Sequence, residues 1–330
     1  MKRRAAALAL AGMLSACLAL TAAAQPTELV PVGRAVGLEL ETGGVYVAGV
    51  DETAQAAGLI KPGDRVLEAG GRPVTQPQEL AELVQGSGGE AVVLRILRRG
   101  RVMSFTLKPE LREGRWRLGL YLREKIAGIG TVTFYDPATG RFGALGHGVS
   151  DPVTGAAIEI KGGLAHLAAI ERVVMGERGK AGELVKAEQS GPLAGTITQN
   201  TPCGLFGLAE GAVFSGPALP VAQPEEVTPG KAEILSCVAG DAPRRYAITI
   251  VSVHADEAGA RDLELRIDDK ALLSRTGGIV QGMSGSPILQ NGKLVGAVTH
   301  VLVQSPARGY GIFLTRMLEQ LARYEQDQAA

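Results

Sequence analysis

The chain has few aromatic residues, few cysteines and no excess of charge of either sign. Aromatic residues make up 4% of its 330 residues, and it contains 3 cysteines and 4 histidines. The 34 basic residues balance 34 acidic ones, which argues against a nucleic-acid partner. No Cys or His pair has the spacing of metal ligands, so we expect no metal site and no cofactor. Glycine is abundant instead, with 45 residues, which indicates β structure rich in turns.

Residues 1–24 have the pattern of a signal peptide or signal anchor. Met1 is followed by three basic residues at 2–4, and residues 5–24 are apolar. The segment could stay as an anchor, because roughly 20 apolar residues can span a bilayer. It could also carry a lipid at Cys17, or be cleaved after Ala24. All three fates place the rest of the chain outside the cytoplasm, and the first two hold it at a membrane.

The other two cysteines, Cys203 and Cys237, form an even pair. In an oxidising compartment they could form a disulfide that closes about 34 residues, worth roughly 3–4 kcal/mol in the loop-entropy model. Two buried thiols are the alternative, and the sequence leaves both open.

Residues 277–287, with the sequence GGIVQGMSGSP, are the most informative stretch of the chain. The glycines around Ser284 let the backbone bend sharply, so that the hydroxyl can point outward and N–H groups can converge. A nucleophilic serine with an oxyanion hole needs both features. The stretch resembles the G-x-S-G-x-P unit of chymotrypsin-like proteases. It does not fit the α/β-hydrolase elbow G-x-S-x-G, because Ser286 occupies the last position.

A serine nucleophile needs a base, and His147 has the most suitable setting. It lies between Gly146 and Gly148 after a strand-like run, far upstream of Ser284. In chymotrypsin-like folds the histidine comes from the first barrel and the serine from the second. We therefore predict that His147 is the general base, and a surface turn histidine is the alternative.

Residues 32–110 have the pattern of a PDZ domain, after a short linker at 25–31. A turn at 61–64, an amphipathic helix at 78–84 and paired strands at 92–97 and 102–107 carry the pattern. A PDZ domain binds a peptide as an added strand and holds its terminal carboxylate with backbone N–H groups. We expect these groups on Val36, Gly37 and Leu38, and a mere spacer domain is the alternative.

Residues 111–330 are predicted to form a second, mostly β domain. Short β-like runs alternate with glycine and proline turns, which suits two packed barrels or a sandwich. A final helix can begin at Thr315, because Leu314, Met317 and Leu318 fall on one face.

Residues 128–137, 143–151 and 277–301 resemble the sporulation stage IV protein B peptidases. The resemblance extends from about Trp116 to the C-terminus, and the upstream PDZ pattern also fits. It implies a chymotrypsin-like double β-barrel with a C-terminal helix, and a highly selective serine endopeptidase. It further implies action in the space between the mother-cell and forespore membranes. The implied substrates are a membrane-bound regulator of an intramembrane metalloprotease and the peptidase itself.

The resemblance also implies roles for individual residues. Backbone N–H groups of Gly282 and Ser284 would form the oxyanion hole. The third catalytic residue carries over to Asp269, only 15 positions before Ser284, which departs from chymotrypsin. Thr299 and His300 would border the bound substrate, although His300 could equally be structural. The other carboxylates near the motifs are Asp136, Asp151 and Asp268.

A non-catalytic PDZ scaffold is the competing function. In that case the β domain would be a degenerate peptidase and its site would have lost residues. The serine, the histidine and their flanking glycines are all present, which favours the enzyme.

Overall fold

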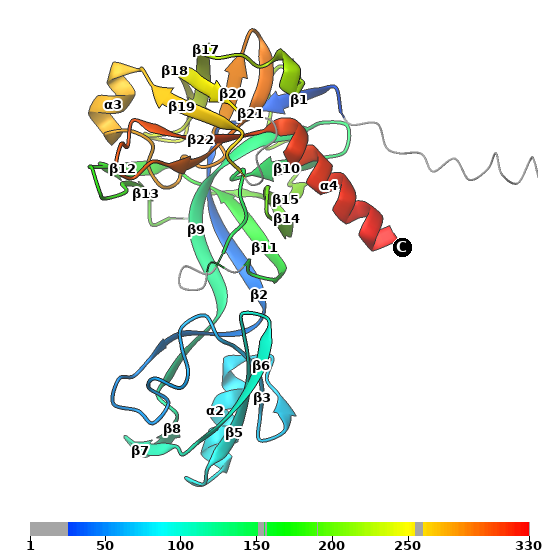
Figure 1. Ribbon diagram of the computed structural model, residues 1–330. Coiled ribbons are helices and arrows are strands. Elements are labelled where there is room, and N and C mark those ends of the chain that lie inside the picture. The colour runs from blue at the N-terminus through cyan, green and yellow to red at the C-terminus, as the bar shows by residue number, and fades with distance from the viewer. Residues whose placement is uncertain (1–25, 151–154, 156, 190, 255–259, 330) are drawn as a thin grey trace, which may run out of the picture.

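The protein consists of two bodies joined by two long strands, as the computed structural model in Figure 1 shows. The structure describes residues 26–150, 155, 157–189, 191–254 and 260–329, so the targeting segment with Cys17 lies outside the described residues. The connecting strands are β2 (Ala35–Val50) and β9 (Leu120–Asp136). None of the described helices is both long and apolar enough to span a membrane.

The first barrel of the larger body is a closed ring of six strands. Hydrogen bonding runs from β2 to β9 and on through β10, β15, β14 and β11 back to β2. Buried and exposed residues alternate along β14, as expected for strands with one face in a core. Strand β1 (Glu28–Pro31) adds to this barrel beside β9. The remaining bounds are β10 Arg141–Ala144, β11 Ile160–Leu167, β14 Leu193–Thr201 and β15 Gly204–Ala209.

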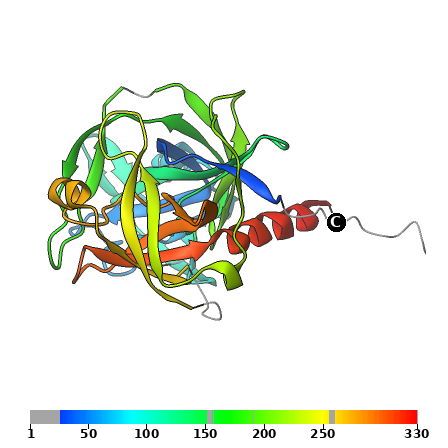
Figure 2. The same cartoon turned by 90° about the horizontal axis from the view of Figure 1, so that it is seen from above.

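The second barrel is also a closed ring of six strands, in the order β17, β18, β19, β22, β21, β20. Its interior is filled by fully buried aliphatic side chains and Phe313. Helix α4 (Leu314–Ala329) follows and extends outward from the barrels (Figure 2), with Met317 and Leu318 buried at its base. The bounds are β17 Gly230–Ser236, β18 Arg244–Val253, β19 Leu263–Ile267, β20 Pro287–Gln290, β21 Lys293–Val301 and β22 Arg308–Phe313. The predicted double barrel with a C-terminal helix is confirmed.

Short elements complete the larger body. A two-stranded sheet and helix α3 lie at one side of it, opposite α4 (Figures 1 and 2). The bounds are β12 Ile170–Val174, β13 Glu183–Lys186, β16 Leu219–Pro220, a 3₁₀ helix Pro224–Glu226 and α3 Lys270–Thr276.

The smaller body has a core of its own, built around one helix and the ends of β2 and β9. The predicted helix is confirmed as α2 (Pro77–Gly86), which starts with a proline and carries Glu79 in its first turn. Leu80 and Val84 of this helix are buried against the sheet. The other bounds are β3 Arg65–Ala69, β4 Arg72–Pro73, β5 Val92–Arg98, β6 Arg101–Leu107, β7 Glu110–Arg112 and β8 Arg115–Arg117.

The PDZ domain does not start at residue 32 as expected, because the first part of β2 belongs to the first barrel. Residues 35–42 pair with β9 and β11 inside the first barrel, and only the later part of β2 pairs with β3 in the smaller body. Strand β2 leaves the barrel at Thr42. The Thr42 hydroxyl lies within hydrogen-bond distance of the Gly44 and Glu124 carbonyls, at 2.6 and 2.9 Å. The chain of the smaller body is therefore an insertion between two barrel segments, the first part of β2 and the last part of β9.

The two cysteines are free thiols in different parts of the core. Cys237 is buried within the second barrel cluster, and Cys203 is half-buried beside the cluster under α4. Of the two alternatives, the structure shows separate thiols and no disulfide between these residues.

Helix α4 should depend on the buried carboxylate of Asp262. The Asp262 carboxylate has no exposed surface, accepts from the Phe313 N–H at 2.9 Å and lies 3.1 Å from the Arg316 guanidinium. We expect Asp262→Ala to lower the free energy of unfolding by about 1–3 kcal/mol, because it removes the acceptor of the buried Phe313 N–H as well as the counter-ion of Arg316. The control is Asp268→Ala, which removes a more exposed ion pair with Arg266 and should cost under ~1 kcal/mol. Equal denaturation midpoints for the two variants would contradict this role.

Candidate active site

The loop that carries Ser284 requires glycine on both sides of the serine, at Gly282 and Gly285. Gly282 and Gly285 have φ angles of 96° and 95°, a region that L side chains rarely adopt. A Cβ atom on Gly285 would also lie 2.0 Å from the Thr131 carbonyl oxygen, so no side chain fits there. The predicted need for glycines around the serine is thus met by both conformation and space.

This loop belongs to the second barrel but is hydrogen-bonded to the first. The Thr131 hydroxyl donates to the Gly282 carbonyl at 2.7 Å, and the Thr133 hydroxyl donates to the Gly285 carbonyl at 2.8 Å. The Thr131 N–H donates to the Ser284 carbonyl at 2.9 Å. Because both threonines are buried, these bonds hold the loop firmly against β9.

Two N–H groups of the loop are available to a ligand. Within the described residues, the N–H groups of Gly282 and Ser284 have no hydrogen-bond acceptor. Four neighbouring N–H groups do donate to backbone carbonyls, namely those of Gln281, Met283, Gly285 and Ser286. A pair of converging free donors is what an oxyanion hole requires, and the assignment itself stays a prediction.

The two serines of the motif have different surroundings. Ser284 is partly exposed, and its hydroxyl donates to the Thr299 carbonyl at 2.7 Å. Ser286 has no exposed surface, and its hydroxyl donates to the Ser236 hydroxyl at 3.0 Å inside the second barrel. Only Ser284 can therefore meet a substrate.

His147 follows a strained turn that lies directly on β21. Leu145 has a φ of 69°, a conformation that costs a residue other than glycine roughly 1–3 kcal/mol. Gly146 also has a positive φ, and a Cβ atom on it would lie 3.0 Å from the Thr299 side chain. The tight approach places His147 beside the strand that also contacts Ser284.

The His147 ring has two contacts. Its Nδ1 lies 2.9 Å from the Gly148 carbonyl oxygen, and its ring centroid lies 4.8 Å from that of His300. Burial lowers the pKa of His147, and the Gly148 carbonyl partly opposes this shift. Among the described contacts there is no hydrogen bond between His147 and Ser284, because the serine hydroxyl is turned to Thr299.

The expectation that Asp269 orients His147 stays a prediction, and the described contacts give Asp269 a structural task as well. Asp269 is the N-cap of α3, and its carboxylate accepts from the Leu272 N–H at 2.9 Å. The first N–H groups of a helix lack partners within the helix, so this carboxylate stabilises the start of α3.

The other candidate carboxylates also have local partners. Asp136 accepts from the Ala138 N–H and the Thr139 hydroxyl, and Asp268 accepts from Thr249 and Arg266. Asp151 lies outside the described residues.

Thr299 and His300 lie near Ser284 and His147 in different ways. The Thr299 side chain is buried and donates to the Ala260 carbonyl at 2.7 Å, so only its backbone faces Ser284. The His300 side chain is exposed on one side and contacts His147 on the other. Sequence reasoning assigned both residues to substrate binding and did not foresee the ring contact, because it joins segments far apart in the chain.

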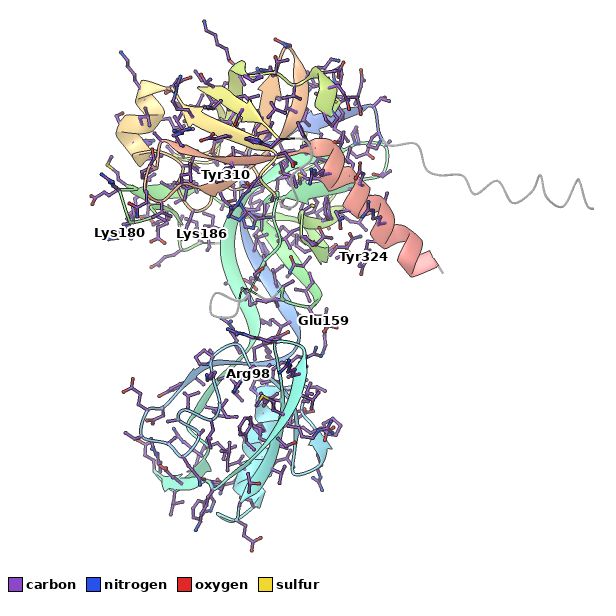
Figure 3. The ribbon with its side chains drawn as sticks, in the orientation of Figure 1. Arg98, Glu159, Lys180, Lys186, Tyr310 and Tyr324 are labelled. Atoms are coloured by element: carbon purple, nitrogen blue, oxygen red, sulfur yellow. The ribbon has the colours of Figure 1, made fainter. Side chains whose placement is uncertain are left out.

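A cleft of about 510 Å³ lies on the side of the Ser284 loop where Leu184 packs. It is lined by residues 37–39 of β2, 127–129 of β9, 166–168 at the end of β11, and 183–189. Leu184 lines the cleft and also packs against the position of Gly282. The Lys186 side chain, labelled beside β9 in Figure 3, covers Gly37 at the edge of the cleft.

The prediction that Val36, Gly37 and Leu38 bind a peptide carboxylate is wrong. These residues pair with β11 on one side and with β9 on the other, so no edge is free for an added strand. The error came from treating residues 35–50 as the first strands of the PDZ domain, whereas β2 starts inside the barrel.

The smaller body instead has a groove between α2 and the start of β9, with a volume of about 1060 Å³. Residues 118–122 form one side, and residues 120–123 of β9 pair with β2 alone among the described strands. The opposite edge of β9 faces α2, which is where a PDZ domain accepts a strand. Leu118-Gly119-Leu120 has the same apolar-Gly-Leu pattern as Val36-Gly37-Leu38. The sequence therefore contains the pattern of a PDZ carboxylate-binding loop twice.

Comparison with protein families agrees with this architecture. The model of the SpoIVB peptidase S55 family matches residues 114–318, well over half of the chain. The chain belongs to the SpoIVB peptidase S55 family. A PDZ domain model matches residues 46–98, which agrees with the inserted body. Membership of the S55 family supports a serine protease function.

Curated relatives of this S55 family member are similar to a short part of it. The magnetosome formation protease MamE of Magnetospirillum gryphiswaldense is 38% identical over 84 residues, which is 24% of this chain and 11% of MamE. MamE of Paramagnetospirillum magneticum is 40% identical over 80 residues, 24% of this chain and 10% of that protein. The matches thus span about a tenth of the length of these relatives.

Solved structures show only distant similarity. The Rv3671c protease from M. tuberculosis in its active form is 16% identical, with a TM-score of 0.36 over 60% of this chain and 74% of that chain. The PDZ domain of the SdrC-like protein from Listeria monocytogenes is 23% identical, with a TM-score of 0.23 over 24% of this chain and 87% of that domain.

The lowered pKa of His147 predicts the pH dependence of the site. A general base acts in its neutral form, and burial keeps His147 neutral to a lower pH than a free imidazole. We expect the rate of Ser284 labelling by a fluorophosphonate to rise with pH through a midpoint below 6.5, the ordinary pKa of histidine. A midpoint above 7 in the folded protein would contradict the assignment of His147 as the base.

Proposed function

We propose that this S55 family member is a serine endopeptidase with Ser284 as nucleophile and His147 as general base. The observation that carries the proposal is the loop of Ser284. It presents a partly exposed hydroxyl and two N–H groups without acceptors, next to the turn that bears His147.

The geometry supports a two-step acyl transfer. The Ser284 hydroxyl first leaves the Thr299 carbonyl and turns to His147 Nε2, which takes its proton as the oxygen bonds to the scissile carbonyl carbon. The carbonyl electron pair moves to oxygen, where the Gly282 and Ser284 N–H groups stabilise the negative charge. His147 then donates the proton to the leaving amine, and water hydrolyses the acyl enzyme by the same route.

A polypeptide is the substrate class that two separate binding features support. The cleft beside the Ser284 loop is lined by residues of β2, β9, β11 and β13 and by the segment that follows β13, and it suits an extended chain. The groove between α2 and β9 suits a second segment or a C-terminus bound as an added strand. A substrate that engages both would gain affinity from the second site without any change in the first.

The biological setting is proposed on family membership and the N-terminal pattern. The basic and apolar residues 1–24 support a location outside the cytoplasm and an association with a membrane. Family membership supports a role in sporulation signalling between mother cell and forespore. The proposed substrates there are a membrane-bound regulator of an intramembrane metalloprotease and the chain itself.

A serine-reactive fluorophosphonate probe tests the catalytic assignment. We expect the full-length protein to be labelled on the peptide that contains Ser284, and Ser284→Ala to abolish labelling and self-cleavage. The small change should leave the fold intact, which a thermal melt can check. Ser274→Ala is the matched control, because Ser274 lies exposed on α3 and its hydroxyl bonds only within that helix.

Two outcomes would overturn the proposal. Labelling of a different residue would move the nucleophile elsewhere. A folded wild-type protein that takes up no probe under any condition would favour the non-catalytic PDZ scaffold.

The groove of the smaller body should contribute to substrate binding and leave the chemistry unchanged. We expect Ala81→Arg to weaken binding of a C-terminal peptide at least tenfold, because Ala81 is exposed on α2 and lines the groove. Gln78→Arg places the same side chain on the same helix away from the groove and should have little effect. Fluorescence anisotropy with a C-terminal peptide library can measure both. Equal binding by both variants would show that the groove is not the peptide site.

A further inference from the structure

Strand β6 forms an open edge of the sheet in the smaller body (Figure 1). It pairs with β5 along residues 101–107, and no other strand among the described residues pairs with it. Residues 101–104 and 106 are exposed and Phe105 is half-buried, so solvent reaches this edge along most of its length. An open edge of this kind is a template for another strand.

The hairpin turn before β6 decides which backbone groups point outward. Arg99 and Gly100 have φ angles of 49° and 75°, which is the type I′ turn of a two-residue hairpin. Such a turn joins Arg98 and Arg101 by hydrogen bonds, and hydrogen-bonded pairs alternate along an antiparallel ladder. The N–H and C=O groups of residues 102, 104 and 106 therefore point away from β5, where the described residues offer them no partner.

This edge carries apolar side chains where edge strands usually carry charge. Val102 is 53% exposed and Met103 is 37% exposed. Met103 lies on the core side of the sheet, because its cross-strand partner Ile96 is fully buried, so the core is left uncovered at this end. No charged residue lies between Arg101 and Lys108. Proteins protect open edges with charges or with a covering segment, so an uncharged apolar edge indicates a partner strand.

The sequence of β6 points to a second copy of the same strand as that partner. Side-chain types repeat on either side of Ser104: Val102 and Thr106 are both β-branched, and Met103 and Phe105 are both large and apolar. A two-fold axis through Ser104 would place Val102 opposite Thr106 of the partner subunit, and Met103 opposite Phe105 of the partner subunit. Cross-strand pairs of these types stabilise a sheet.

We propose that two copies of this chain associate through antiparallel pairing of their β6 strands about a two-fold axis at Ser104. In this register the outward groups of residue 104 meet those of residue 104, and the outward groups of residue 102 meet those of residue 106, so each has a partner. Arg101 falls opposite Leu107 of the partner subunit, so no like charges face each other directly. Such an interface is isologous, and it closes at two copies.

The dimer leaves the other binding features accessible. None of the residues that line the groove between α2 and β9 belongs to β6, so a peptide can bind there while β6 is paired. The inference does not depend on the proposed function, because it uses no residue of the candidate active site.

Cysteine cross-linking tests the register in the full-length protein in detergent micelles. In the proposed dimer the two Cα atoms of residue 104 are about 5.5 Å apart, within the range of roughly 4.4–6.8 Å that a disulfide spans. The two Cα atoms of residue 106 are about 14 Å apart, because four residues of strand separate them. We expect Ser104→Cys to form a reducible dimer on mild oxidation at least about tenfold faster than Thr106→Cys. Wild type gives the background from its own cysteines.

A charge at the axis tests the strength of the interface. Ser104→Lys places two lysines opposite each other, and we expect it to raise the dimer dissociation constant at least about tenfold in sedimentation velocity. Leu111→Lys is the matched control, because Leu111 is exposed in the same body but lies on β7, and its dissociation constant should equal that of wild type. Thermal melts check that both variants are folded.

Three results would overturn the inference. The first is a full-length wild-type protein that stays monomeric at every concentration tested. The second is a dimer that Ser104→Lys leaves unchanged, which would place the contact elsewhere, for example in residues 1–24. The third is equal cross-linking of Ser104→Cys and Thr106→Cys, which would mean association without the proposed register.

Discussion

The candidate site depends on the contact between β9 of the first barrel and the Ser284 loop of the second. Two buried threonine hydroxyls, from Thr131 and Thr133, satisfy the carbonyls of Gly282 and Gly285. Leaving either buried carbonyl without a donor would lower the free energy of unfolding by about 1–3 kcal/mol. These hydrogen bonds therefore fix the position of one barrel against the other. The same contact leaves no space for a side chain at Gly285, which explains why the serine is followed by glycine.

Strand β9 also joins the site to the inserted PDZ body. Residues 120–123 form one side of the groove against α2, and residues 131 and 133 contact the nucleophile loop. One continuous strand therefore carries both surfaces. The topology follows from the insertion of the smaller body between the halves of β2 and β9, since both strands must leave the barrel and return to it.

Much of this could be predicted from short segments. Helix α2 was visible in its apolar spacing, and the base of α4 in Leu314, Met317 and Leu318. The glycines around Ser284 predicted a bent loop, and the structure has positive φ angles there. These features depend on neighbouring residues, so a reading along the chain can detect them. The PDZ boundary was misplaced because residues 35–50 contain a strand, two glycines and a second strand, which looks like a hairpin when the partners are unknown.

The sequence alone thus determined the mostly β class, the main helices and the bent glycine-flanked loop of Ser284, because each arises from local conformation and periodicity. Tertiary structure decided the rest. Asp269 turned out to cap a helix, the groove lies at residues 118–122, and His300 contacts His147. These facts depend on which distant segments pack together. The partner of a side chain is the group that lies beside it in the folded protein, and that group can be far away along the chain.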